Sequence, residues 1–303
     1  DRGRFRPAGR RRRRRNHAAD ARASGDPRSP GSFAWPCRLD EDRRRLAGTG
    51  RGGRRRSRKP ACCIVACGRC NSPSGKPARI RSIHAQNRPA EKGVAGERCA
   101  LNLAGDGVAK DSVERGDFIL APDLHAPTDR IDARFRLLAS EKKPIAQWAP
   151  IRLHHAAGDI AARIVLLGDE PIAPGSEVFA QFVLERAIAA AVGDRFVARD
   201  TTAQRTIGGG VFVDLRAPTR KRRTPERRAV LAAAMPANAA DALRGLLAVA
   251  PRYVDLAGFA RDRALSDDAF AKICSVLEIV ELSGGGARIG LSRETFAQLS
   301  DGL

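Results

Sequence analysis

The 303-residue sequence lacks several features that large classes of protein require. No apolar run reaches the roughly 18–20 residues that cross a bilayer, which argues against an integral membrane protein. Seven cysteines are too few for a fold held together by disulfides and favour the reducing cytoplasm. Met235 is the single methionine and the first residue is Asp1, so we expect a fragment or a processed chain.

Two motifs that hold nucleotides in hydrolytic enzymes are also missing. Neither G-x-x-x-x-G-K-[ST] nor N-K-x-D occurs in the sequence. At Gly75-Lys76, the nearest approach, Cys70 stands where the first glycine is needed and Pro77 replaces the Ser or Thr that binds Mg²⁺. We therefore expect this chain to have no enzymatic activity and no cofactor of its own.

Positive charge is abundant and concentrated at one end. The chain has 55 Lys and Arg residues against 34 acidic residues, and residues 1–60 alone hold 20 Arg and one Lys against six acids. A segment so poor in apolar residues cannot offset its ordering entropy, so residues 1–71 are expected to be disordered. They could be a salt-sensitive nucleic-acid arm, or the translation of GC-rich DNA in a wrong frame.

Four cysteines follow this arginine-rich segment, at positions 62, 63, 67 and 70. The spacing Cys67-x-x-Cys70 could supply two thiolates to one tetrahedral zinc ion. A second pair is needed to complete such a site, and none follows, so no metal site is predicted.

Residues 72–218 have the texture of two small β-barrels. In the first, 72–125, strands are expected at 78–84, 98–104 and 118–120, with Ile80 on one face and Arg79 and Arg81 on the other. In the second, 126–218, six strands are expected, separated by turns that include the glycines at 208–210. Glycines without Cβ also let a backbone pass close to a neighbouring strand or an RNA phosphate. The predicted strands are 131–138, 151–155, 161–167, 176–184, 195–199 and 211–215.

Residues 219–303 have the pattern of a winged-helix module, a common nucleic-acid-binding unit. Helices are expected after four capping residues, ending near Met235, Val249, Leu265 and Val276. A hairpin at 277–291 and the start of a further helix at 292–299 complete the pattern. The expected caps are Thr224, Asn238, Asp255 and Ser266.

Several stretches resemble translational GTPases of the elongation factor Tu group, and in particular SelB-type selenocysteine-specific elongation factors. They are I-R-S-I-H-A-Q-N-R-P at 80–89, G-V-A-G-E-R-C-A-L-N-L at 93–103, G-D-R-F-V-A-R-D at 193–200 and Q-R-T-I-G-G-G-V at 204–211. The resemblance implies a mainly β fold: two elongation-factor barrels, the first incomplete, followed by a winged helix. It also implies a C-terminal part without the GTPase domain, to which GTP and Mg²⁺ bind in the intact family.

The same resemblance implies binding of selenocysteinyl-tRNA and the ribosome. Arg79, Arg81, His84 and Arg98 would face the aminoacyl end or the tRNA backbone, and Arg199, Arg205 and Thr206 the tRNA stem. Lys221, Arg222 and Arg223 are candidates for further backbone contacts. Binding of the mRNA insertion hairpin is not expected, because the last winged-helix modules of the family are missing.

Three alternatives stay open at this level. Arg199 and Arg205 could pair with Asp200 or Asp214 and serve only the fold. The arginine-rich segment and the winged helix could belong to a DNA-binding regulator. The chain could also be the remnant of a gene without function.

Overall fold

In the computed structural model, the residues described are 75, 77–93, 97–105, 108 and 113–301. These residues all belong to one compact unit, 34–303. The expectations for residues 1–71, including the cysteines at 62–70, lie outside the described residues.

The first sheet contains three antiparallel strands in the order β2-β1-β3: β1 (Arg79–Ala85), β2 (Arg88–Ala90) and β3 (Cys99–Ala104). Gln86 and Asn87, at φ 49° and 65°, form the two-residue turn between β1 and β2. Positive φ at both positions matches the right-handed twist of a hairpin. Within the described part of 72–125 these strands form an open sheet, and the incomplete barrel predicted there stays a prediction.

The predicted strand at 118–120 is wrong, because these residues have no strand geometry. Phe118 instead stacks on His155, with ring centroids 5.5 Å apart, and Leu120 packs with Ala189. Contact with apolar surface thus replaces strand pairing in this segment, which leads into the short 3₁₀ helix η3 (Pro122–Leu124).

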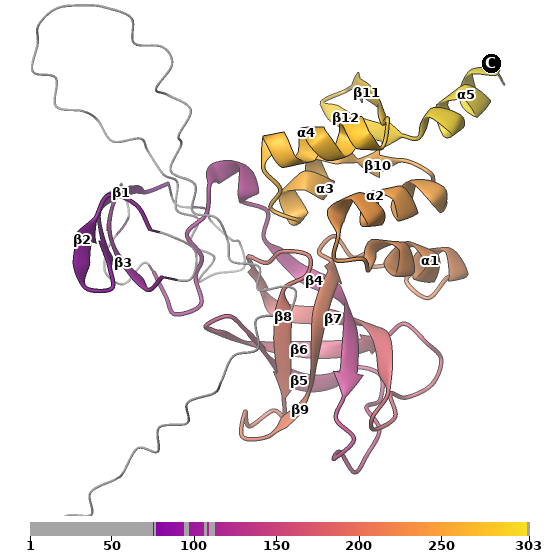
Figure 1. Ribbon diagram of the computed structural model, residues 1–303. Helices are drawn as coiled ribbons and strands as arrows, with labels where there is room; N and C mark the ends of the chain where they lie inside the picture. Colours follow the sequence, from indigo (N-terminus) through magenta and orange to yellow (C-terminus); the bar gives the residue numbers. More distant parts are fainter. Residues whose placement is uncertain (1–74, 76, 94–96, 106–107, 109–112, 302–303) are drawn as a thin grey trace, which may run out of the picture. The chain divides into compact units, whose positions relative to one another are not determined.

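The second barrel is confirmed. Six antiparallel strands close in the order β4-β7-β6-β5-β8-β9 (Figure 1). They are β4 (Thr128–Leu137), β5 (Ala149–His155), β6 (Gly158–Leu166), β7 (Glu177–Ile188), β8 (Arg195–Arg199) and β9 (Thr206–Asp214). Alternate residues of each strand face the interior, so one side of every strand is apolar and the other is left for polar groups.

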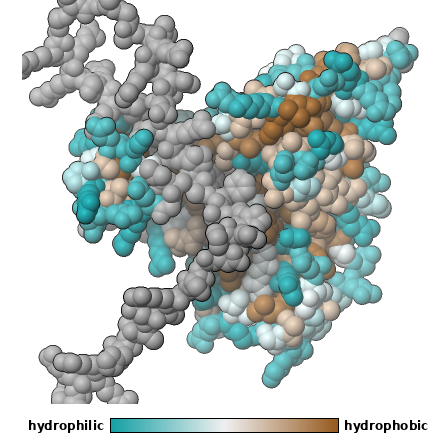
Figure 2. Space-filling model, viewed as in Figure 1, coloured by the Kyte–Doolittle hydropathy of each residue, from teal (hydrophilic) through white to brown (hydrophobic). Residues whose placement is uncertain are grey.

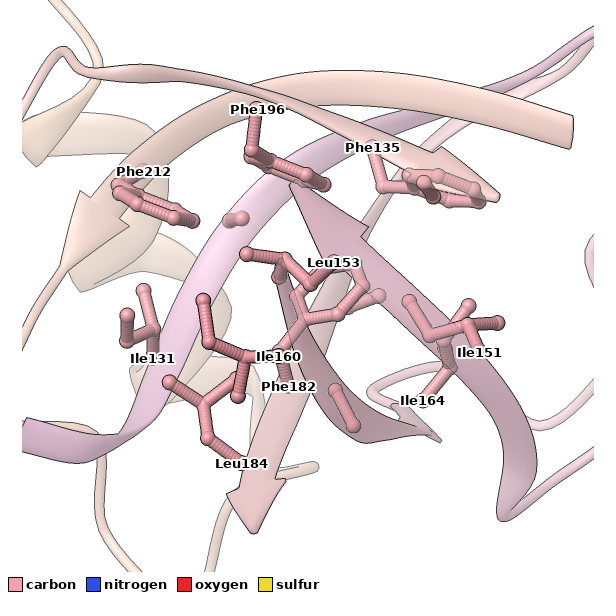
Figure 3. Packing of buried hydrophobic residues seen from close by; sticks show 14 of the residues in the cluster. Ile131, Phe135, Ile151, Leu153, Ile160, Ile164, Phe182, Leu184, Phe196 and Phe212 are labelled. Carbon is pink, nitrogen blue, oxygen red and sulfur yellow. The ribbon is translucent and has the colours of Figure 1, made fainter. Parts of the chain in front are cut away.

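Aromatic rings fill one side of the barrel interior. Phe135, Phe196 and Phe212 lie in a row above aliphatic side chains that include Leu153, Ile160 and Leu184 of β5, β6 and β7 (Figure 3). Phe196 stacks on Phe212 at 5.0 Å and on Phe135 at 6.3 Å between ring centroids. These contacts fix which faces of β8 and β9 point outward.

The glycines at 208–210 lie inside β9, so their prediction as a turn is wrong. A Cβ on Gly208 would lie 2.5 Å from the carbonyl oxygen of Arg136, and one on Gly209 would lie 2.8 Å from that of Phe196. Gly210 is flanked by Phe135 and Phe196 on the two neighbouring strands. The three glycines therefore let β9 lie close to the neighbouring strands β4 and β8. This agrees with the prediction that residues without a Cβ let the backbone pass close to a neighbouring strand.

The remaining elements form the predicted winged helix. They are α1 (Pro225–Ala234), α2 (Ala239–Ala248), β10 (Val254–Asp255), α3 (Leu256–Asp262), α4 (Asp267–Val276), β11 (Val280–Gly284), β12 (Ala287–Leu291) and α5 (Arg293–Asp301). All four predicted capping side chains accept backbone N–H groups at their helix starts. Helix α3 ends before the predicted Leu265, since Ala264 adopts a left-handed φ of 49°.

Helix α1 is joined to the barrel by a buried ion network. Arg227 donates to the carboxylates of Asp132 and Asp214, at 2.5 Å in each case. Gln181 donates to Asp132 at 2.8 Å, and both of these side chains are fully buried. Burial raises the pKa of Asp132, although the charge of Arg227 opposes this rise.

None of the helices that the structure describes combines the length and apolar character needed to cross a lipid bilayer.

Candidate nucleic-acid interface

Arginines gather on the outer face of three adjacent barrel strands, β5, β6 and β8. Arg152 of β5 lies directly opposite Arg199 of β8, and Arg163 of β6 lies opposite Pro150 of β5. Like charges at opposed positions destabilise a sheet. Asp159 interacts electrostatically with both Arg152 and Arg199 and offsets part of their charge.

Few intramolecular contacts offset these charges. Arg152 donates through Nε to Asp159 at 2.9 Å, and this hydrogen bond raises the pKa of Arg152 and lowers that of Asp159. Among the described residues, the Arg199 side chain donates to one neutral acceptor, the carbonyl of Ala203 at 2.8 Å. A guanidinium carries five N–H donors, so most of the donors of Arg152 and Arg199 remain available to a ligand.

A shallow hollow of about 460 Å³ lies on this face. Arg152, Arg163, Glu185 and Thr201 line it, together with the small side chain of Ala161. Two arginines therefore line a depression on the outside of the barrel wall whose remaining walls are mostly apolar. We name this surface, defined by Arg152, Arg163 and Arg199, the arginine face.

The predicted residues of the β8–β9 region come together at the edge of the arginine face. Arg199 pairs with Thr206 in the strand register, and Thr206 is exposed. The connecting loop is ordered by Asp200, whose Oδ1 accepts the backbone N–H groups of Gln204 and Arg205 at 3.0 and 3.3 Å.

The alternative that these arginines pair with acidic residues and serve only the fold is supported in part. The Arg205 guanidinium pairs with Glu141 and lies 4.0 Å from Asp200, yet its side chain stays 59% exposed. Asp214 pairs with Arg227 instead. Arg205 is therefore tied to the fold and accessible at the same time.

The basic run before α1 is docked on the barrel. Arg222 donates to the side-chain oxygen of Gln181 at 3.1 Å and lies over the ring of Trp148. Arg223 donates to the carbonyl of Leu166 at 3.1 Å. Lys221 is exposed, with a left-handed φ of 52°. Arg222 and Arg223 thus hold the linker in place, whether or not they also contact nucleic acid.

The other predicted residues lie on the three-stranded sheet. Arg79, Arg81 and His84 are exposed on β1, and Arg98 is exposed just before β3. A β-bulge between Ile80 and Ser82 turns Ile83 inward, which leaves Arg79 and His84 on the same outer face. Hydrophilic residues cover most of this sheet on the side shown in Figure 2.

Sequence reasoning missed Arg152 and Arg163. Both stand at alternating positions within strands that were predicted, so an outward orientation could have been deduced from the alternation alone. Their closeness to Arg199 could not, because it depends on which strands pair.

Metal binding has no structural support within the described ranges. They contain no group of three or more His, Cys, Asp or Glu side chains that could hold an ion.

Known proteins with similar sequences point to one family. Residues 132–219 match the model described as the β-barrel domain of the selenocysteine-specific elongation factor. The selenocysteine-specific elongation factor of Escherichia coli is 36% identical over 199 residues, which cover 65% of this chain and 30% of that protein. The Haemophilus influenzae protein of the same name is 32% identical over 154 residues, or 51% of this chain and 24% of that protein.

The fold agrees with the sequence relationship. A crystal structure of a bacterial selenocysteine-specific elongation factor, EF-Sec, superposes with a TM-score of 0.54 at 18% identity, covering 79% of this chain and 35% of that one. The chain spans less than a third of the length of the curated relatives it matches. The chain is similar in sequence to selenocysteine-specific elongation factors, and residues 132–219 match the β-barrel domain described for that family.

Proposed function

We propose that this chain is the tRNA-binding part of a selenocysteine-specific elongation factor, acting in the cytoplasm and on the ribosome without catalysis of its own. The observation that carries the proposal is the arginine face, where Arg152 and Arg199 oppose each other across two strands. Phosphates of an RNA backbone are the ligands that such a face suits, because guanidinium groups displace their counterions.

The exposed cations of the three-stranded sheet are proposed to serve the aminoacyl end. Arg79 and His84 share one outer face of β1, with Arg81 at the bulge and Arg98 before the neighbouring strand. A selenol ionises more readily than a thiol, and nearby guanidinium groups would stabilise its anion. These four residues therefore form a reasonable selenocysteine-binding group.

GTP and Mg²⁺ are proposed to belong to the intact factors and not to this chain. Its sequence has neither nucleotide motif. Its triple glycine at 208–210 lies within a strand of the barrel ladder, and its other one, at 284–286, joins β11 to β12. Neither stands at a helix N-terminus, where backbone N–H groups would point at phosphate. The mRNA insertion hairpin is likewise not proposed as a partner.

Charge does not favour the alternative of a DNA-binding regulator. Residues 225–301, which hold the winged helix, contain nine Lys and Arg residues against ten acidic residues. Helix α4, which would enter a groove, begins with Asp267 and Asp268 and carries Lys272 as its single cation. An RNA- or DNA-binding face is normally basic, so the barrel is the better candidate for RNA contact.

Removing charge from the arginine face is expected to weaken tRNA binding and its salt dependence together. For R152Q and R199Q, affinity for selenocysteinyl-tRNA should fall, and the slope of log affinity against log salt should flatten by about one for each lost phosphate contact. Filter binding between about 50 and 200 mM salt measures both quantities.

The matched control is R244Q, which removes an exposed arginine of α2 that is paired with Asp241. It should leave the tRNA affinity unchanged. Equal salt slopes for R152Q, R199Q and the parent protein would show that these arginines do not contact phosphate. GTP hydrolysis by the purified chain would contradict the absence of catalysis.

A further inference from the structure

Trp148 is a large apolar side chain in a position that the fold does not favour. It precedes β5, is 43% exposed and has a left-handed φ of 63°. Bulky residues rarely adopt this backbone conformation, in which Gly or Asn costs less. An exposed, strained tryptophan therefore points to a binding role more than to a folding role.

The backbone at Trp148 is held rigidly. Its N–H donates to the carbonyl of Ile164 at 2.8 Å, and its own carbonyl accepts from Arg163 at 3.4 Å. The side chain of the preceding residue, Gln147, accepts the N–H of Leu166 at 2.7 Å. The indole ring is therefore attached to a backbone position that the neighbouring strand holds in place.

One face of the Trp148 ring is already occupied by a cation. The Arg222 guanidinium lies over the ring at 5.5 Å from its centroid. Trp148 still keeps 43% exposure beside this guanidinium, so part of its ring surface remains accessible. A second flat group could stack there, giving a three-layer arrangement in which the guanidinium strengthens the electrostatic attraction.

Within the described residues, no acidic side chain forms an ion pair with the arginines near Trp148. Arg163, Arg222 and Arg223 each donate to a neutral oxygen, from the Trp148 carbonyl, the Gln181 amide and the Leu166 carbonyl respectively. Arg220 and Lys221 are exposed in the same linker. Cations that have no acidic partner in the described part of the chain, next to an aromatic ring, favour a ligand that is both planar and anionic.

We propose that Trp148, backed by Arg222, is a stacking platform for an unpaired RNA base, and that Arg163 and Arg223 bind the phosphates beside that base. This inference rests on the proposed RNA-binding function, and it concerns a contact at the border of the arginine face, with which it shares Arg163. It predicts that the protein prefers unpaired over fully paired RNA at this position, because a base inside a duplex has no free face.

The test uses the full chain carrying W35F, so that Trp148 is the single tryptophan. A short single-stranded oligoadenylate should quench its fluorescence, and the same strand annealed to its complement should quench it much less. W148L, which keeps apolar bulk without an aromatic ring, should bind the single strand about tenfold more weakly. W148F should stay within about threefold of the parent affinity, since its ring can still stack. The affinities of W148L and W148F for the single strand are measured by filter binding in chains that retain Trp35.

Y253A is the control, because Tyr253 is an exposed aromatic of the winged-helix module, at 51% exposure. It should bind the single strand like the parent. Unchanged affinity in W148L, or equal quenching by duplex, would overturn the proposal and assign Trp148 to packing against Arg222 alone. Adenosine monophosphate and polyglutamate are tested as competing ligands. If either bound as tightly as the oligonucleotide, the proposal of an RNA-stacking platform would also be overturned.

The two proposals fail separately. If R152Q and R199Q weaken tRNA binding while W148L does not weaken binding of the single strand, the arginine face stands and the platform is wrong. If the parent chain binds neither RNA, the proposed function itself fails.

Discussion

Replacing Arg227 with methionine is expected to lower the free energy of unfolding by about 3–5 kcal/mol, the cost of leaving a buried charge without its partner. Asp132 is fully buried, and in R227M its carboxylate would keep only the amide of Gln181. Asp214 would lose the same cation. Urea unfolding followed by circular dichroism measures the effect.

The matched control is R244M, which breaks an exposed pair between Arg244 and Asp241. It should change stability by less than about 0.5 kcal/mol, because solvent already screens that pair. The double variant D132N/R227M should recover part of the loss, since a neutral amide is cheaper to bury than a carboxylate. Equal stability of R227M and R244M would mean that Arg227 and Asp132 are not paired and buried in solution.

The penalty of R227M should also depend on pH. Burial raises the pKa of Asp132 in the folded state, and without Arg227 nothing of opposite charge counters this rise. A folded-state pKa above the unfolded value gives stability that is present at low pH and is lost as the pH rises through the folded pKa. R227M should therefore be closer to the parent in stability near about pH 5 than near about pH 8.

The second large effect is expected from G210A. A methyl group on Gly210 would overlap the carbonyl oxygen of Arg134 and meet the Phe196 ring at 3.0 Å. The clashing atom is backbone in a paired strand and cannot rotate away. We expect a loss of about 3 kcal/mol, at the upper end of the usual cost of overpacking, measured by thermal or urea unfolding.

G168A provides the comparison, because a Cβ on Gly168 would meet nothing within 4 Å. Its stability should stay within about 0.5 kcal/mol of the parent. If G210A were as stable as G168A, there would be room for a Cβ at position 210. The strands β4 and β9 would then lie farther apart than they do in this barrel.

Features that depend on a few neighbouring residues could be predicted from the sequence. Thr224, Asn238, Asp255 and Ser266 cap their helices as expected, since a cap depends only on the residue and the backbone groups that follow it. The barrel strands were found because alternation of apolar residues is a local pattern as well.

Predictions failed where distant contacts decide the outcome. The apolar stretch at 118–120 looks like a strand, but Phe118 finds a partner in His155 of the barrel instead of a neighbouring strand. The triple glycine at 208–210 has the composition of a turn. It lies within a strand instead, where Arg134, Arg136 and Phe196 of the adjacent strands leave no room for a Cβ. Neither partner is visible in the local sequence.

The sequence by itself indicated the six strands of the closed barrel, the helix starts set by caps, and the resemblance of the barrel to selenocysteine-specific elongation factors. Only the tertiary structure decided that Arg152 faces Arg199, that Arg227 reaches Asp132 across 95 residues, and that Arg222 covers Trp148. The physical reason is that a helix cap and an apolar alternation each involve only a few consecutive residues. Charge clusters and buried pairs depend on strand pairing and docking, which join residues that no local pattern relates.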